Sequence, residues 1–198
     1  MAWQPDYCTV SELKSFLRIS DSTDDTELGY AITAASRAVD ARTNRQFGSV
    51  SPVETRLFTA EWDRRRQRWV VAIDDVQDTT GLTVTVDAGG ITDYTLEPVN
   101  GPETGRPYER LVVNSTSEFA PTSEEYGVSI DALWGWSSVP TTIKQATLMQ
   151  ASRFHARRFS PYGIAGSPDS GTEMRLLNRI DPDVAVTLTP YTRWWAAA

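Results

Sequence analysis

The chain has 198 residues, of which 40% are hydrophobic, and a formal net charge of −7. It can bury a substantial core, and its size suits one domain or one domain with an insertion. No segment approaches the roughly 20 apolar residues of a membrane-spanning helix, and the first residues lack a signal-peptide pattern, so we expect no membrane contact. Cys8 is the only cysteine, which excludes an intramolecular disulfide, and we expect it to behave as a small hydrophobe.

Residues 1–50 are predicted to form two N-terminal helices. Thr9 and Glu12 have the spacing of a capping box, which predicts a helix from residue 10 to about residue 18. The acidic segment 20–25 should cap a second helix at roughly 24–45. The packed face of this second helix should contain Leu28, Ile32, Ala35, Val39 and Arg42, and its outer face Glu27, Arg37 and Asp40. Gly48 is expected to end the helical unit.

Residues 53–134 form a predicted β-rich insertion. Short β-branched and aromatic runs alternate there with Gly, Pro, Asn and Asp, which indicates five or six strands. Residues 82–98 are predicted to form a hairpin, because the sequence Asp-Ala-Gly-Gly suits a turn. Leu82, Val84 and Val86 should share one face of its first strand.

A long helix is predicted near residues 140–159, bounded by Pro140 and Pro161. Its apolar residues point in two directions, which is typical of a helix deep in a core or between a core and a neighbouring subunit. One flank contains Ile143, Thr147 and Phe154, and the other contains Leu148, Ala151 and Phe159. From this we predict a subunit interface at Leu148, Arg153, Arg157 and Phe159.

The rest of the chain is predicted as a helical segment that completes the region 139–180 and an extended docking tail at 181–198. The alternation of Val184, Val186 and Leu188 favours an extended conformation. Two tryptophans near the end have large apolar rings to bury. Either the tail folds back on its own core, or Tyr191, Trp194 and Trp195 bind another subunit or protein.

A second candidate for partner binding is an arginine-rich segment that resembles a hairpin tip. It has four arginines between two tryptophans, and its candidate residues are Trp62, Arg64, Arg65, Arg66, Arg68 and Trp69. Arginine recognises phosphates and carboxylates and stacks on indole rings, so this segment could hold nucleic acid or an acidic protein surface. The alternative is a solvated hairpin end.

Signals for catalysis are weak. His155 is the only histidine, and neither a nucleophile elbow nor a phosphate-binding glycine loop occurs. Asp74 and Asp75 are adjacent in a predicted strand and should point to opposite faces. We therefore expect no metal, no cofactor and no enzyme activity; a hydrolase that depends on His155 is a minor alternative.

The order of these segments resembles the head-tail connector, or adaptor, family of tailed bacteriophages. Residues 9–20 and 24–48 resemble the paired N-terminal helices of that family, and residues 84–98 its β-hairpin. Residues 128–166 resemble its last strand, its Trp-Gly-Trp turn and the helix that follows. Residues 179–193 are similar to the tail of connectors from phages that infect actinobacteria.

The resemblance implies an α+β protein with one connector domain over residues 1–198. It implies a non-enzymatic protein of the virion neck, made in the host cytoplasm, that forms a ring of twelve copies under the portal protein. Its partners would be the portal, the head-tail stopper or next neck protein, and double-stranded DNA in transit. The alternative is a nucleic-acid-binding module that uses the arginines at 64–68.

Overall fold

The computed structural model describes residues 4–158, 164–165, 174–175 and 180–193. Four α-helices and a seven-stranded antiparallel sheet confirm the mixed α+β class. The described residues divide into two compact units: a helical unit within residues 4–46 and 139–193, and a β unit of Phe47–Ser138. In the sequence, the β unit therefore lies between two parts of the helical unit, and a single connector domain stays a prediction.

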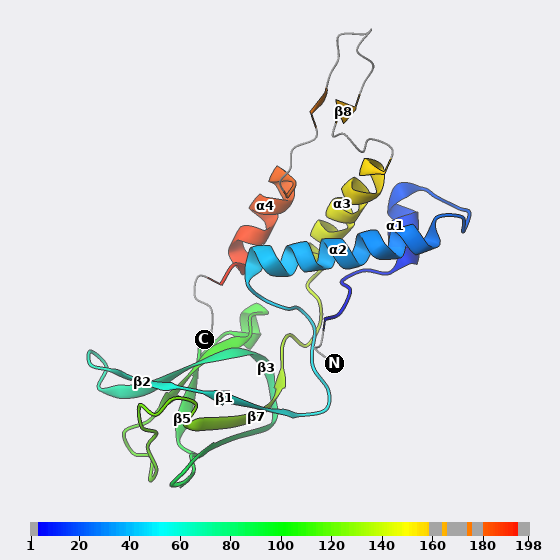
Figure 1. Cartoon of the computed structure of the whole chain (residues 1–198). Helices are drawn as coiled ribbons and strands as arrows, with labels where there is room; N and C mark the ends of the chain where they lie inside the picture. Colours follow the sequence, from blue (N-terminus) through cyan, green and yellow to red (C-terminus); the bar gives the residue numbers. More distant parts are fainter. Residues whose placement is uncertain (1–3, 159–163, 166–173, 176–179, 194–198) are drawn as a thin grey trace. The chain divides into compact units, whose positions relative to one another are not determined.

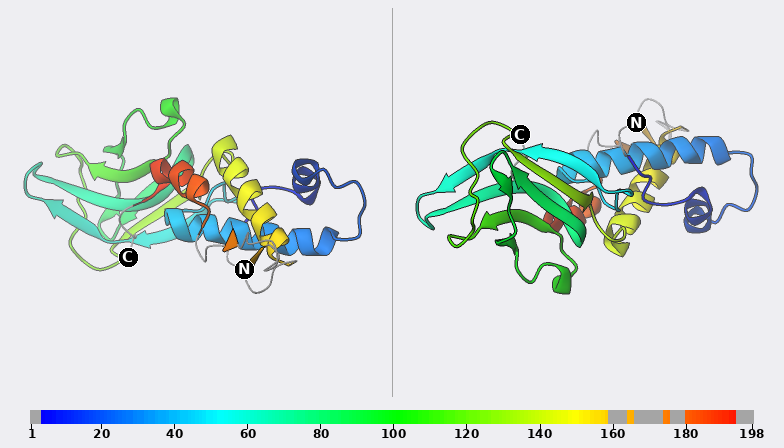
Figure 2. Two further views of the ribbon diagram at one scale, coloured as in Figure 1. Left: turned by 90° about the horizontal axis from the view of Figure 1, so that it is seen from above. Right: turned by 90° about the horizontal axis from the view of Figure 1, so that it is seen from below.

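The described residues of the helical unit form four α-helices, a short 3₁₀ helix and one pair of short strands. The elements are α1 (Val10–Leu17), α2 (Asp25–Thr43), α3 (Thr141–Arg157), β8 (Ile164–Ala165), β9 (Met174–Arg175), α4 (Pro182–Leu188) and η3 (Thr189–Tyr191). In both views of Figure 2, α3 crosses α2. The helix α3 contacts α1, α2 and α4, and thus connects the whole unit.

The first two helices form where the sequence predicts them. Thr9 and Glu12 make the expected capping box at α1. Asp24 occupies the N-cap position of α2 and Asp25 its first turn, as expected, but the Asp24 side chain makes no cap hydrogen bond and instead accepts from Arg158 Nη1 at 2.6 Å. Gly48 does not end α2 either, since Asn44 adopts the left-handed conformation that closes it.

A buried cluster joins α1, α2 and α3. It consists of Cys8, Leu13, Leu28, Ala31, Ile32, Ala35, Leu148 and Ala151. Phe154 packs against this cluster as well, and the predicted division of the apolar residues of the long helix into two flanks stays a prediction. Leu148 is only 8% exposed, and burial in its own chain leaves it little surface for the predicted subunit interface. Packing on α1, α2 and α4 accounts for the two apolar directions of α3.

The tail is helical from residue 182 to residue 188, so the predicted extended conformation is wrong there. Asp181 caps α4 by accepting from Asp183 N at 2.9 Å, and Pro182 occupies its first turn. Val184 and Leu188, four residues apart, are fully buried, whereas Val186 is 75% exposed. The helical segment predicted before the tail is also wrong where it is described, since Met174–Arg175 is a strand.

The β unit is an antiparallel sheet with the strand order β1-β7-β3-β6-β5. Its strands are β1 (Glu54–Phe58), β2 (Ala60–Asp63), β3 (Arg68–Val86), β4 (Gly89–Gly90), β5 (Tyr94–Glu97), β6 (Tyr108–Val113) and β7 (Val128–Trp134), with a short 3₁₀ helix η1 at Pro102–Thr104. The long strand β3 pairs with β2 and β6 through its first part and with β7 and β4 through its last part. Figure 1 shows this long strand running through the sheet.

Alternation along the strands creates the core of the β unit. In β7, Val128, Ile130, Ala132 and Trp134 are buried, and the residues between them are half-buried. Gly135 follows with a φ of 105°, and a side chain there would collide with the Gly48 carbonyl oxygen. This close approach explains the glycine between Trp134 and Trp136.

The predicted hairpin at 82–98 is only partly correct. Val84 and Val86 are buried and Leu82 is half-buried on one face, as expected. The turn pairs Thr85 and Val86 with Gly90 and Gly89. The following strand β5 pairs with β6 instead of returning along β3.

Candidate interaction surfaces

The arginine-rich segment is the tip of the β2–β3 hairpin, as predicted. Trp62 pairs with Trp69 and Asp63 with Arg68 across the two strands, and the hairpin extends from the sheet in Figure 2. The two indole rings pack edge to face on each other, with centroids 5.3 Å apart. Trp62 is 47% exposed, so the tip presents an aromatic surface beside its cations.

Contacts within the chain hold two of the four arginines. Arg66 Nη1 donates to Glu97 Oε1 at 2.9 Å, and this hydrogen bond, more than any other cause, raises the pKa of Arg66. Arg68 Nη1 donates to Asn114 Oδ1 at 3.2 Å. These contacts position Arg66 and Arg68 on the flank of the hairpin.

Arg64 and Arg65 face solvent. Neither side chain has a hydrogen bond or ion pair with any residue that the structure describes. Asp63 Oδ1 shapes the turn beneath them by accepting from Arg65 N at 2.9 Å and from Arg66 N at 3.1 Å. The Asp63 side chain and these two backbone N–H groups thus hold the turn, and the side chains of Arg64 and Arg65 are available to a partner.

A second basic surface lies on α3. Arg153 Nη1 donates to Asp181 Oδ2 at 3.1 Å, and its side chain is 16% exposed. Arg153 and Arg157 line a pocket of about 380 Å³ together with Ala38, Ala41, Arg42, Gln150, Phe154 and Ile180. The lining combines guanidinium groups with apolar side chains, a combination that can bind a group with both acidic and apolar parts. The role of Arg153 and Arg157 at a subunit boundary stays a prediction.

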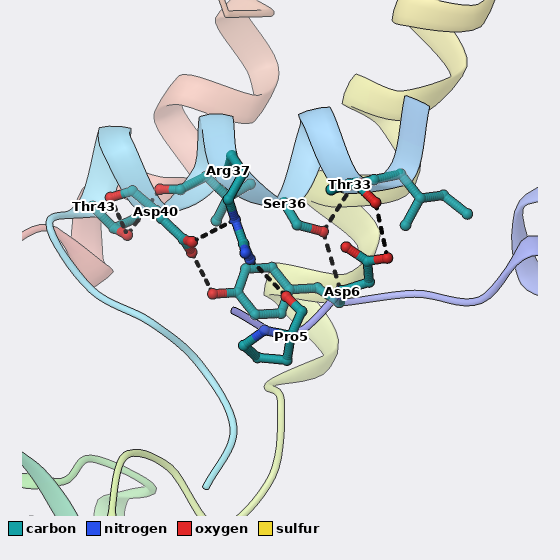
Figure 3. A network of polar contacts seen from close by, with 10 residues as sticks. Pro5, Asp6, Thr33, Ser36, Arg37, Asp40 and Thr43 are labelled. Carbon is teal, nitrogen blue, oxygen red and sulfur yellow. Dashed lines mark hydrogen bonds and ion pairs between the residues drawn. The ribbon is translucent and has the colours of Figure 1, made fainter. Parts of the chain in front are cut away.

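The segment before α1 is fixed along α2, on the face that the sequence predicts to be exposed (Figure 3). The buried Tyr7 hydroxyl donates to Asp40 Oδ1, and Arg37 Nη2 donates to the Pro5 carbonyl oxygen at 2.6 Å. Arg37 Nε also lies 2.9 Å from Asp40 Oδ2. Burial raises the pKa of Asp40, although the Tyr7 hydrogen bond and the Arg37 charge oppose this shift.

The last described residues are fixed to the end of α2. Arg45 Nε donates to the Tyr191 carbonyl oxygen at 2.7 Å, and Asn44 Nδ2 donates to the Arg193 carbonyl oxygen at 3.1 Å. Arg193 N donates to the Thr43 carbonyl oxygen at 2.8 Å. Sequence reasoning missed both anchors because their partners are far apart in the chain; the polar residues at the end of α2 were the available signal. Phe159, Trp194 and Trp195 lie outside the described residues.

The groups considered for catalysis do not converge. Asp74 accepts from Arg56 Nη1 at 2.6 Å, while the buried Asp75 accepts from Trp136 Nε1 at 2.9 Å, so the two carboxylates face opposite sides as predicted. Cys8 is buried, and burial, followed by the charges of Glu12 and Asp6, raises its pKa to about 11. No group of three or more histidine, cysteine or acidic side chains suited to a metal occurs in the described ranges.

No helix of the described residues is both long and apolar enough to cross a bilayer. Comparison with curated proteins found no match. The family model described as phage gp6-like head-tail connector protein matches residues 7–65, a range that contains α1, α2, β1 and β2 and ends at the arginine-rich tip. This match confirms, over the N-terminal part of the chain, the head-tail connector resemblance found in the sequence, whereas the likeness to connectors of phages that infect actinobacteria stays a prediction.

Proposed function

We propose that the chain is a non-enzymatic structural protein of the phage neck, which connects the DNA-filled head to the next neck or tail protein. The observation that carries this proposal is the match of residues 7–65 to the head-tail connector family. The matched helices α1 and α2 supply most of the buried cluster of the helical unit. The part of the chain with the family likeness is thus the part on which this unit is built.

In the proposed assembly, twelve copies form a ring that binds the portal protein on one side and the head-tail stopper or next neck protein on the other. Double-stranded DNA passes through the ring during packaging and ejection. The net charge of −7 supports such a passage, because a surface with the sign of the phosphates discourages adhesion of DNA.

Sedimentation of the purified protein with and without portal tests this function. We expect the protein to sediment with the portal as a complex of many copies. A protein that stays separate from the portal of its own phage at all concentrations would contradict the proposal.

The tail is proposed to dock on a partner through Tyr191, Trp194 and Trp195. A deletion from residue 181 would also remove the buried Val184 and Leu188 from the helical unit, so a loss of docking could then reflect a damaged fold. Truncation after Arg193, or the double substitution Trp194→Ala and Trp195→Ala, leaves α4 intact. Either change should abolish incorporation into heads without lowering stability, and normal incorporation would contradict a docking role.

A further inference from the structure

The tip of the β2–β3 hairpin and an exposed acidic loop of the same unit have complementary chemistry. The tip presents Arg64 and Arg65 beside the half-exposed Trp62. The loop before β7 presents Glu124, Glu125 and Tyr126, and the Tyr126 side chain is 52% exposed. Each surface thus contains two neighbouring like charges and one exposed aromatic ring, with opposite signs of charge.

The four charged side chains of the tip and the loop have no partner among the described residues. Arg64, Arg65, Glu124 and Glu125 make no side-chain hydrogen bond or ion pair within the part of the chain that the structure describes. Most other charged groups of the unit are engaged, as Arg66 is with Glu97 and Arg56 with Asp74. Unpaired charges of opposite sign on one molecule are suited to contacts between molecules.

The two surfaces cannot meet within one copy. Tyr126 N donates to Thr59 Oγ1 at 3.0 Å, which fixes the acidic loop at the start of β2. The strand β2 leads away from Thr59 as far as Asp63, and Arg64 follows in the turn; five residues of extended chain correspond to about 17 Å at a rise of about 3.3 Å per residue. Pairing of β2 with β3 keeps the hairpin extended, so the arginines cannot fold back onto the loop.

The charge balance of the unit disfavours DNA as the partner of the tip. Residues 47–138 contain fifteen acidic residues and seven basic ones. Two available arginines would neutralise few phosphates, while the surrounding negative charge would repel the rest of a duplex. A second copy of the same acidic unit, in contrast, would be attracted to the tip.

We propose that the arginine tip of one copy docks on the Glu124–Tyr126 loop of a neighbouring copy, an assignment that rests on the proposed ring. The tip and the loop are different surfaces of one chain, so each copy can bind one neighbour through its tip and another through its loop. Such head-to-tail contacts repeat from copy to copy, and in a ring the last copy binds the first. Exposed ion pairs are individually weak, so the contact forms chiefly where the portal holds copies at high effective concentration.

Charge reversal tests this contact. The variants are R64E/R65E, E124R/E125R and the combination of all four substitutions, and the readout is the number of copies per portal in native mass spectrometry. Each double variant should require a concentration at least about tenfold higher than wild type to fill the ring, because attraction becomes repulsion. The combined variant should recover the wild-type value, since the charges are exchanged.

A matched control reverses two other acidic residues of the β unit. Asp87 and Glu103 are exposed, and D87R/E103R changes the net charge as E124R/E125R does but should fill the ring normally. Filling by either test variant at the wild-type concentration, or a combined variant as defective as its parents, would overturn the proposal. The proposal would also be overturned if R64E/R65E lowered the affinity for duplex DNA but filled the ring at the wild-type concentration.

A further measurement separates this contact from the proposed function. If wild-type protein does not bind the portal, the neck role fails, and self-association at high protein concentration then tests the contact alone. Sedimentation equilibrium should show salt-sensitive association that weakens in both double variants and returns in the combined one. Equal association of all variants would refute the contact.

Discussion

The substitution Leu188→Ala tests whether residues 182–188 form a helix that packs on the rest of the helical unit. Leu188 is completely buried on α4, which contacts α2 and α3. Replacement of a fully buried leucine by alanine removes its transfer free energy and leaves a cavity, so it should lower the free energy of unfolding of the helical unit by about 2–5 kcal/mol. The same tail offers an internal control, because Val186 is 75% exposed. Val186→Ala should change the free energy of unfolding by no more than about 0.5 kcal/mol.

Hydrogen exchange measured by mass spectrometry can show whether the helical unit or the β unit loses stability in L188A. In L188A, amides of α2 and α3 should exchange faster, while those of β3 and β7 should keep the wild-type rate. An extended tail would place residues 184, 186 and 188 on one face, so V186A would then be as damaging as L188A. Equal losses in the two variants would refute the helix.

Three further predictions concern separate contacts. Tyr7→Phe removes the hydroxyl that donates to Asp40 and should lower the free energy of unfolding by about 1–2 kcal/mol in urea titrations; an unchanged value would contradict the network in Figure 3. Cys8, buried and with a pKa of about 11, should react slowly with a thiol reagent at neutral pH and quickly once urea unfolds the chain, whereas rapid native labelling would place it at the surface. Hydrogen bonds from the hydroxyls of Thr55 and Thr83 hold the pKa of Asp131 below its ordinary value. The ionised Asp131 therefore stabilises the fold above its unfolded pKa, and this contribution is lost as the pH falls through its folded pKa. Asp131→Asn should make the free energy of unfolding less dependent on pH in the acid range, and an unchanged pH dependence would be evidence against the contact.

Local signals explain the parts of the fold that the sequence predicts correctly. The capping box at Thr9 and the regular spacing in α2 act within a few residues of the chain, and both helices form as expected. The hairpin tip at 62–69 is predictable for the same reason, because its two strands are joined by a short turn.

The sequence-based predictions fail where one segment fits both a helix and a strand, or where residues far away in the chain determine its conformation or pairing. Val184 and Leu188 suit a helix as well as a strand, and the Asp-Pro sequence at 181–182 was the signal that favours the helix. The strand β5 pairs with β6 because of tertiary contacts that its own sequence does not specify. Likewise, the pairing of Arg66 with Glu97 and of Tyr7 with Asp40 joins residues about thirty positions apart.

Electron microscopy of the assembled neck tests the central claim most directly. We expect copies of this chain to form a ring between the portal and the next neck protein, with density for the helices α1 and α2 in every copy. Absence of the chain from that position in particles with a complete neck would contradict it.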